Sequence, residues 1–314
     1  MTGGRVAVHS LTMPIVRTLG GDIGPERLGV TLIHEHLVVD VRRPEESDGH
    51  RDDLETIVEP MLEHLRSVRA QGVRTVVDCT PTDVGQHLDA YRAVAARTGL
   101  QVVAAVGTYR DAWLPPWVRA AARDELADWY VAGLERHAGF VKLGCDPEGP
   151  SPDEAKCAAA AGLASRRTGA LVACHLGQAA PAERVLDAFE SGGGDPGRFV
   201  VVHLQNEPDP KRHLELAGRG AWVEYDAIGA QPSDQAYVDL LRRLADAGRL
   251  DRALISQDAC AYMVVAGGRV ERQHRFDHLI GRFVPALRAA GFGPEEVERL
   301  LVRNPAIALA RPSP

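Results

Sequence analysis

Four histidines and one aspartate in this sequence have side chains that commonly bind metal ions. His34 and His36 are two residues apart, so their side chains project from one face if the segment is a strand. His175, His203 and Asp258 follow at long intervals. Imidazole and carboxylate groups together suit zinc and similar divalent ions. Each residue alone could equally satisfy a nearby backbone group, so a metal site requires the fold to bring all five together.

Lys142 is the least expected member of an apolar segment, residues 139–144 (GFVKLG). A buried ammonium there is strongly disfavoured unless its charge is compensated. Two interpretations stay open. Lys142 could snorkel, or pair with a carboxylate such as Asp258. Beside four histidines, it could instead react with CO2 to form N6-carboxylysine, an anionic ligand able to bridge two metal ions.

Eight short apolar runs, each followed by a helical pattern, determine how these residues would be arranged. The runs are residues 30–37, 73–80, 101–109, 139–145, 170–177, 198–204, 221–228 and 253–260. Near-continuous apolar strands alternating with helices indicate a parallel sheet that is covered on both faces. Eight such units favour an α/β fold that closes into a (β/α)8 TIM barrel, with its active site at the C-terminal ends of the strands. A doubly wound sheet is disfavoured because no G-x-G-x-x-G follows the first strand.

The remaining segments fit one domain over residues 1–314. Gly20 and Gly21 predict a short hairpin across the bottom of the barrel, in an N-terminal segment (1–29) that precedes a barrel over residues 30–310. Amphipathic patterns and capping residues predict helices over residues 52–70, 151–167 and 233–247. A long loop and a helix over residues 261–282 are expected to cover the barrel mouth.

The composition restricts the class of protein. The chain has 314 residues, with 36 Lys and Arg against 43 Asp and Glu, a net charge of −7, and no basic block. Binding to nucleic acid or to an anionic membrane is therefore not expected. The five cysteines form no C-x-x-C pair, which is typical of buried free thiols in a reducing compartment. Because no signal-like N-terminal segment and no apolar stretch of about 18 residues occur, a cytoplasmic location is predicted.

The order of these residues resembles the phosphotriesterase-like branch of the amidohydrolase superfamily, which includes phosphotriesterases and phosphotriesterase-like lactonases. The likeness extends from residue 24 to about residue 310. The matching motifs are His34-Glu35-His36, Val77-Asp78-x-Thr80, Gly139-Phe140-Val141-Lys142, Ala173-Cys174-His175, Val202-His203, Ser256-Gln257-Asp258 and Val302-Arg303-Asn304-Pro305.

The resemblance implies two divalent ions per chain, with zinc expected first and cobalt or manganese also compatible. By likeness, the buried ion would be held by His34, His36 and Asp258. The more exposed ion would be held by His175 and His203, and the carboxylated lysine would bridge the two ions together with a hydroxide. Such a pair lowers the pKa of bridging water and polarises the bond under attack. Asp258 would accept the proton as a catalytic residue.

The choice of substrate depends on residues beyond the metal ligands, since the fold alone does not decide it. Tyr109 lines up with a strand-3 tyrosine that lactone-hydrolysing members place beside the hydroxide, although it could simply be an amphipathic ring at the rim. Arg110 could meet a substrate carboxylate or phosphate, or be solvated. Ala227 and Asn206 stand where phosphotriesterases have proton-relay residues, which argues against an efficient phosphotriesterase.

Aromatic and polar residues near the strand ends are expected to line an apolar substrate pocket with a few polar anchors. These substrate contacts are Tyr109, Arg110, Trp113, Trp117, Tyr225, Asp226, Tyr262 and Met263. His274 and His278, four residues apart, are expected to pack in a lid rather than to act in catalysis.

The leading hypothesis is a metal-dependent hydrolase, with a small-molecule lactone or related carboxyl ester as substrate. A phosphotriester, amide or carbamate hydrolase with the same metal site is the alternative. A non-catalytic ligand-binding barrel is the alternative from another class, and the complete set of six ligands argues against it. A homodimer is expected because such barrels commonly pair.

Overall fold

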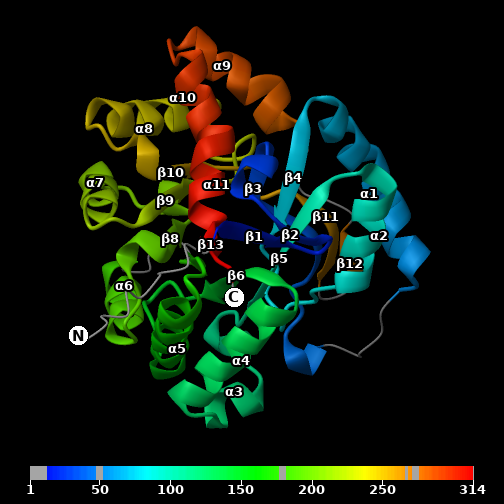
Figure 1. The fold of residues 1–314 in the computed structure, drawn as a ribbon, viewed down its shortest axis with the longest axis vertical. Coiled ribbons are helices and arrows are strands. Elements are labelled where there is room, and N and C mark those ends of the chain that lie inside the picture. The colour runs from blue at the N-terminus through cyan, green and yellow to red at the C-terminus, as the bar shows by residue number, and fades with distance from the viewer. Residues whose placement is uncertain (1–12, 47–51, 177–181, 266–267, 271–275, 314) are drawn as a thin grey trace, which may run out of the picture.

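The computed structural model describes residues 13–46, 52–176, 182–265, 268–270 and 276–313. Parallel strands form its centre and helices surround them (Figure 1). The strands, in chain order, are β3 (Val30–Asp40), β4 (Val73–Asp78), β5 (Gln101–Gly107), β6 (Ala138–Gly144), β7 (Val172–His175), β8 (Phe199–Val202), β9 (Trp222–Tyr225) and a last strand in two pieces, β10 (Ala253–Ile255) and β11 (Cys260–Val265).

Each strand pairs in parallel with the next one along the chain, and β11 pairs in parallel with β3. The junction between β10 and β11 stays attached to β3, because Asp258 N donates to His34 O at 3.1 Å and His36 N donates to Ala259 O at 2.8 Å. The sheet therefore closes on itself, and the prediction of a (β/α)8 barrel is confirmed.

Helices cover the outside of the barrel (Figure 1). They are α1 (Leu54–Ala70), α2 (Leu88–Thr98), α3 (Pro116–Ala120), α4 (Arg123–Arg136), α5 (Pro152–Thr168), α6 (Ala182–Ser191), α7 (Pro210–Gly218), α8 (Asp234–Asp246), α9 (Val284–Ala289), α10 (Pro294–Glu298) and α11 (Asn304–Leu309). The three helices predicted from sequence occur within two residues of their expected ends. Their caps explain the starts: the side chains of Asp53, Ser151 and Ser233 accept hydrogen bonds from backbone N–H groups of the first turn.

The bottom of the barrel is filled by apolar side chains from strands and from the N-terminal hairpin. Strand β1 (Pro14–Thr18) pairs antiparallel with β2 (Gly21–Ile23), as the two glycines predicted, and also with β13 (Arg311–Pro312). Val16 of this hairpin packs in one buried cluster with Phe140 and Trp222. The hairpin and cluster fill this end, so the barrel interior is open at the C-terminal ends of the strands.

The segment after the last barrel strand differs from the prediction. Residues 261–282 were expected to form a loop and a helix. A helix does begin at the end of this segment, as the π-helical turn Leu279–Phe283, but β11 extends to Val265 and pairs antiparallel with β12 (Gly268–Val270). Cys260 lies opposite His36 and Val264 opposite Asp40, so the apolar run continues the barrel strand upward as one arm of a hairpin. Among the described residues, no helix is long and apolar enough to cross a membrane.

Candidate active site

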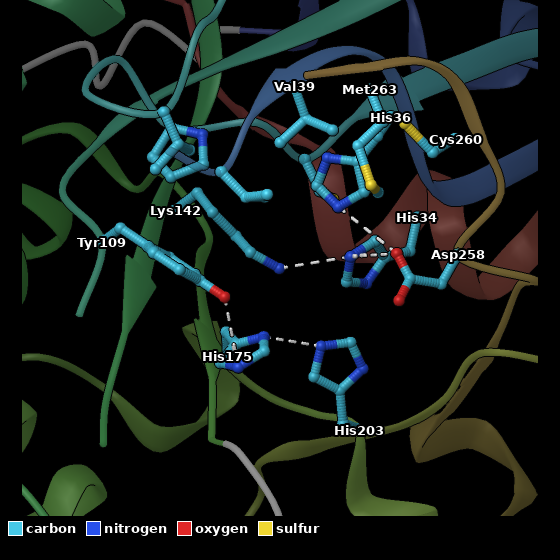
Figure 2. Close-up of a pocket in the computed structure, with 14 residues that line it drawn as sticks. His34, His36, Val39, Tyr109, Lys142, His175, His203, Asp258, Cys260 and Met263 are labelled. Carbon is cyan, nitrogen blue, oxygen red and sulfur yellow. Dashed lines mark hydrogen bonds and ion pairs between the residues drawn. The ribbon is translucent and has the colours of Figure 1, made fainter. Parts of the chain in front are cut away.

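A pocket opens at the C-terminal ends of the strands, and all six predicted metal ligands line it (Figure 2). The lining residues are His34, His36, Val39, Val41, Cys79, Pro81, Val84, Tyr109, Lys142, His175, His203, Asp258, Cys260 and Met263. The ligands come from strands β3, β6 and β7 and from the turns after β8 and β10. The barrel therefore brings together side chains that are far apart in sequence.

His34 is a buried residue of β3 whose two ring nitrogens face different surroundings. Its Nδ1 atom is hydrogen-bonded to the carboxylate of Glu224. Its Nε2 atom lies 3.6 Å from Asp258 Oδ1 and 3.4 Å from Lys142 Nζ. A proton on Nδ1, donated to Glu224, leaves a lone pair on Nε2 that points into the pocket.

His36 and Asp258 meet on the same side of the pocket. The His36 Nδ1 atom lies 2.8 Å from Thr80 Oγ1, and its Nε2 atom lies 3.3 Å from Asp258 Oδ1. Burial lowers the pKa of His36, which favours the neutral ring that a metal ion requires. Desolvation alone would raise the pKa of Asp258, but His34 and the hydrogen bond from His36 hold it well below its usual range. Asp258 is therefore an ionised acceptor among imidazoles.

His175 and His203 form the other half of the cluster. His203 Nε2 lies 2.8 Å from His175 Nδ1. The opposite nitrogen of His203 lies 2.5 Å from Asp226 Oδ1, and the opposite nitrogen of His175 lies 3.4 Å from the Tyr109 hydroxyl. Burial, assisted by His203, lowers the pKa of His175 well below its ordinary value, so its ring is neutral.

The backbone at the mouth is strained at three positions. Among the described non-glycine residues, only His203, Ala227 and Asp258 have positive φ, at 61°, 55° and 48°. Side chains seldom adopt this left-handed conformation, which costs about 1–2 kcal/mol per residue. Two of the three residues are candidate ligands, and such strain concentrates at functional sites.

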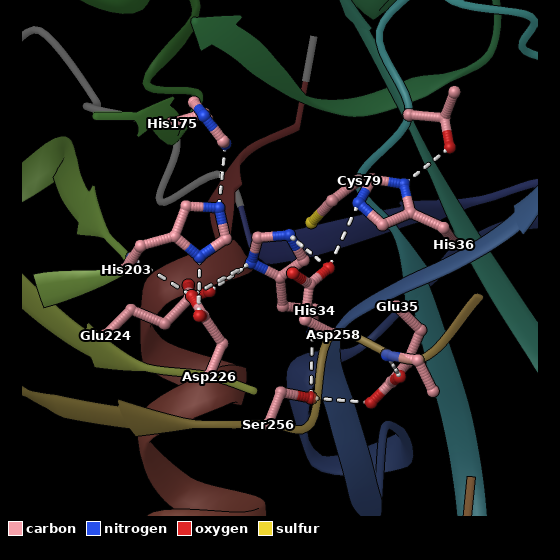
Figure 3. Close-up of polar contacts among 12 residues, drawn as sticks. His34, Glu35, His36, Cys79, His175, His203, Glu224, Asp226, Ser256 and Asp258 are labelled. Atoms are coloured by element: carbon pink, nitrogen blue, oxygen red, sulfur yellow. Dashed lines mark hydrogen bonds and ion pairs between the residues drawn. The ribbon is translucent and has the colours of Figure 1, made fainter. Parts of the chain in front are cut away.

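Hydrogen bonds from the motif around His34 hold Asp258 in this conformation (Figure 3). Glu35 accepts from Ser256 Oγ at 2.8 Å and from Ala259 N at 2.7 Å. Because these residues flank Asp258, Glu35 ties the strained turn to β3. Burial raises the pKa of Glu35 to about 8.

Lys142 lies inside the pocket with only 2% of its surface exposed. Its Nζ atom lies 3.4 Å from His34 Nε2, and no carboxylate of the described residues lies within ion-pair distance of it. The structure therefore does not show the alternative in which Lys142 pairs with Asp258, and its burial excludes snorkelling. A buried ammonium without a counter-charge is costly, and carbamate formation would remove that charge.

The donor set fits divalent metal ions. Each histidine has one nitrogen tied to the chain, by Glu224, Thr80, Asp226 or Tyr109, and the other directed at the cluster. Metal-binding histidines are typically oriented in this way. The ligand atoms of His34, His203 and Asp258 lie within 4.8 Å of one another, close enough for a common ion.

An aromatic rim lies beside this cluster. The rings of Tyr109 and Trp113 meet edge to face at 5.3 Å, and Trp113 Nε1 donates to Val41 O at 3.2 Å. Burial raises the pKa of Tyr109 to about 12, so the phenol keeps its proton at neutral pH. Arg110 Nε donates to Asp146 Oδ1 at 2.8 Å, and its guanidinium stands 5.2 Å from the Trp113 ring. Its charge is therefore already compensated.

Several predicted substrate contacts lie outside this pocket. Tyr225 is fully buried, and its hydroxyl bonds to His213 Nδ1 at 2.8 Å. Asp226 binds His203 instead of facing the cavity. Tyr262 is buried on β11 and donates to the carboxylate of Asp52. The structure therefore places none of these three side chains at the pocket. Tyr225 lies on the opposite face of its strand from the inner residues, and another group of the protein already binds the polar atom of each.

The other predicted mouth residues have mixed positions. Met263 lines the pocket, whereas Trp117 is 46% exposed and packs against Trp129 at 5.0 Å. His278 binds Asp234 at 2.9 Å, consistent with a packing role. His274 lies outside the described residues.

Sequence reasoning missed Glu224 and Thr80, which orient His34 and His36. Glu224 is two residues before Asp226, so alternation along a strand would have placed both on the inner face. Thr80 was noticed only as part of a motif. Cys79 and Cys260 also line the pocket, and no pattern in the sequence distinguished them from the other buried thiols.

Comparison with known proteins gives one consistent result. The model of the phosphotriesterase family matches residues 14–309. A phosphotriesterase homology protein of Escherichia coli is 29% identical over 292 residues, covering 88% of this chain and 96% of the relative. An N-acetyltaurine hydrolase of Danio rerio is 28% identical over 341 residues, covering 92% and 96%. A solved structure described as organophosphate hydrolysis engineered from a weak promiscuous lactonase template superposes with a TM-score of 0.85 at 26% identity, covering 94% of this chain and 99% of the other.

Proposed function

The chain belongs to the phosphotriesterase family of hydrolases, and from that premise we propose that it is a dinuclear metal-dependent hydrolase that opens lactones. The observation that carries the proposal is the Tyr109 hydroxyl, which lies 3.4 Å from His175 Nε2 and projects into the pocket beside the ligand cluster (Figure 2). A lactone presents both a carbonyl and a ring oxygen to such a donor.

Two sets of residues would hold the ions. His34, His36 and Asp258 would hold one, His175 and His203 the other, and Lys142 as N6-carboxylysine would join both. When bound, the ions would lower the pKa of a water molecule, which then serves as the nucleophile, and would act as a Lewis acid toward the carbonyl oxygen. Carbamate formation would begin with the loss of one proton from the Lys142 ammonium. The neutral amine would then join CO2 and release a second proton, so that an uncompensated cation becomes an anion suited to the site.

The protein's own groups would guide the reaction. Ionised Asp258 accepts the proton of the attacking water and returns it to the leaving alkoxide. Tyr109, which stays protonated, donates a hydrogen bond to the substrate oxygen. Val39, Val84 and Met263 form an apolar wall beside it, which suits the hydrocarbon part of a neutral ester.

The pairing of Arg110 with Asp146 bears on the choice of lactone. Since Arg110 already has a carboxylate partner and does not line the pocket, a substrate needs no anionic substituent. We therefore expect lactones with and without a carboxylate or phosphate to react at similar rates.

Amide hydrolysis is a second candidate, favoured by the similarity to N-acetyltaurine hydrolases across almost the whole chain. Such a substrate carries an anion, so it would require Arg110 to leave Asp146 and turn toward the pocket. The same ligand cluster would serve both reactions.

Initial rates of the metal-loaded protein on a matched panel test the proposal. The panel holds acyl-homoserine lactones with short and long chains, γ- and δ-lactones, an aryl ester, N-acetyltaurine and paraoxon. A lactone preference of at least about 100-fold in kcat/KM, about 2.7 kcal/mol of transition-state discrimination, is expected. Faster hydrolysis of N-acetyltaurine would establish the second candidate. No hydrolysis of any compound by the metal-loaded protein would favour a ligand-binding barrel.

A further inference from the structure

We propose that Glu224 is a positioning residue that fixes the ring of His34 and thereby sets the affinity of one half of the metal site. The inference rests on the proposed dinuclear site. Glu224 lies on β9, a strand that supplies none of the candidate ligands, and its carboxylate does not line the pocket. It contacts the cluster only through His34.

The contact between these two residues is closed to solvent. The side chains of His34 and Glu224 are 1% and 3% exposed, and the Nδ1 atom of the ring donates to Oε1 of the carboxylate (Figure 3). A buried carboxylate without a partner would be strongly destabilising. Among the described residues, His34 is the hydrogen-bond partner of the Glu224 side chain, so ring and carboxylate stabilise each other.

This contact determines which nitrogen of His34 is available. With the proton on Nδ1, the lone pair of Nε2 points toward Asp258 and Lys142, at 3.6 and 3.4 Å. If the proton were instead on Nε2, that nitrogen could not bind a metal ion. The lone pair of Nδ1 would then face a lone pair of the Glu224 carboxylate, which is repulsive. Glu224 therefore selects the tautomer that binds metal.

The nearby carboxylate of Asp226 is engaged mainly with His203 and Gln205. Its Oδ1 atom accepts from His203 Nδ1 at 2.5 Å and from Gln205 Nε2 at 2.7 Å, and its Oδ2 atom accepts from His203 N at 3.0 Å. Its distance to His34 Nδ1 is 3.5 Å, longer than either of its contacts with His203. Glu224 is therefore the nearer partner of His34, and Asp226 is held mainly by His203.

Strand β9 and Asp226, the residue directly after it, thus contact one imidazole in each half of the cluster. The two carboxylates are two residues apart, so they project from the same face of the strand. Their own ligand atoms and that of His34 come within 4.8 Å, which would suit an ion at that position instead. The existing hydrogen bonds argue against it, because an ion there would displace the protons that hold both rings.

Metal titration of three variants tests the proposal. Glu224→Gln keeps the shape and an acceptor oxygen but removes the charge, whereas Glu224→Ala removes the acceptor as well. We expect one of the two ions to bind about 10- to 100-fold more weakly in Glu224→Ala, with Glu224→Gln between it and the wild type. Asp226→Asn should weaken the other ion. The readout is metal content against increasing chelator, with the denaturant midpoint measured alongside.

Glu154→Gln is the matched control. Glu154 is also a buried carboxylate, but it accepts from the backbone N–H groups of Asp111, Asp146 and Ser151 and touches none of the histidines. Its substitution should lower the denaturant midpoint and leave both metal affinities unchanged.

The outcomes separate this inference from the proposed function. If the wild type binds two ions and both Glu224 variants retain them within about twofold, the inference is wrong and the dinuclear proposal stands. Equal weakening of both ions by Glu224→Ala would also overturn it, because the effect would then be general. If the wild type binds fewer than two ions, both claims are contradicted.

Discussion

The Nε2 atom of His203 lies 2.8 Å from the Nδ1 atom of His175, and each ring has its other nitrogen bonded elsewhere in the chain. The two rings approach edge to face, with their centroids 4.5 Å apart. Two imidazole nitrogens this close require a proton or a cation between them. His34 and His36 differ, because the Nε2 atom of each faces Asp258 Oδ1, at 3.6 and 3.3 Å.

Lys142→Ala should release at least one metal ion and reduce kcat/KM for lactones by at least about 100-fold, because it removes the ligand that would join both ions. Metal content and initial rates measure this. Lys156→Ala, on the outer surface of α5, is the control and should change neither. NMR of protein equilibrated with isotope-labelled CO2 should show a carbamate signal that Lys142→Ala lacks. Retention of both ions by that variant would contradict the carbamate assignment.

Tyr109→Phe should lower kcat/KM for lactones by about 100-fold, since it removes one donor to the substrate oxygen. The ring contacts with Trp113 and His175 should persist, so the unfolding midpoint should barely change. Tyr130→Phe is the matched control, because it removes a buried hydroxyl bonded to Thr108 at 3.0 Å. It should cost about 1 kcal/mol of stability and keep kcat/KM. Unaltered lactone hydrolysis in Tyr109→Phe would assign the ring a packing role only.

Ala227→Gly should stabilise the protein by about 0.5–1 kcal/mol, because Ala227 has a φ of 55° that glycine adopts without strain. Urea unfolding of the metal-free protein measures the change. Ala290→Gly, at a helix end with a φ of −80°, is the control and should destabilise by a similar amount. A lower midpoint for Ala227→Gly would show that the left-handed turn is not strained.

The buried carboxyl of Asp83 should make the free energy of unfolding decrease as the pH rises. Burial raises the pKa of this carboxyl from 3.8 to about 7, so the folded protein keeps the proton to a higher pH than the unfolded chain does. The contribution of the protonated Asp83 carboxyl to the free energy of unfolding is therefore fully present below about pH 4. It is lost as the pH rises through about 7. Because Asp83→Asn cannot ionise, its stability relative to the wild type should increase between those limits. Denaturant midpoints at several pH values measure this.

The control for that experiment is Asp246→Asn, which removes an exposed carboxylate on α8. Its stability difference from the wild type is measured over the same pH range, for comparison with that of Asp83→Asn. The Oδ2 atom of Asp83 accepts a hydrogen bond from Tyr109 N at 3.1 Å. If the stability difference between Asp83→Asn and the wild type did not change with pH, the Asp83 carboxyl would not be desolvated in solution.

The barrel and the cluster of candidate ligands could be predicted because they depend on local patterns. Each apolar strand ends in a polar residue, and parallel strands that close into a barrel place those ends at one mouth. The positions of His34, Lys142 and Asp258 at this mouth therefore follow from the sequence pattern. The hairpin at the bottom followed equally from the Gly20-Gly21 pair.

The residues that orient the cluster could not be predicted with the same ease. Glu224 is an acidic residue in a four-residue strand, and its role depends on how far β9 lies from His34 across the barrel. Tyr225 seemed suited to the pocket, but it points outward to His213. Such assignments depend on the pleat and register of short strands, where a shift of one residue reverses the direction of every side chain.

Stepwise return of zinc to chelator-treated protein tests the central claim most directly. Hydrolysis of an acyl-homoserine lactone should be absent without metal and should rise until about two equivalents per chain are bound. Bound metal and initial rate should be measured on the same samples. Full activity in the metal-free protein, or saturation at one equivalent, would contradict a dinuclear hydrolase.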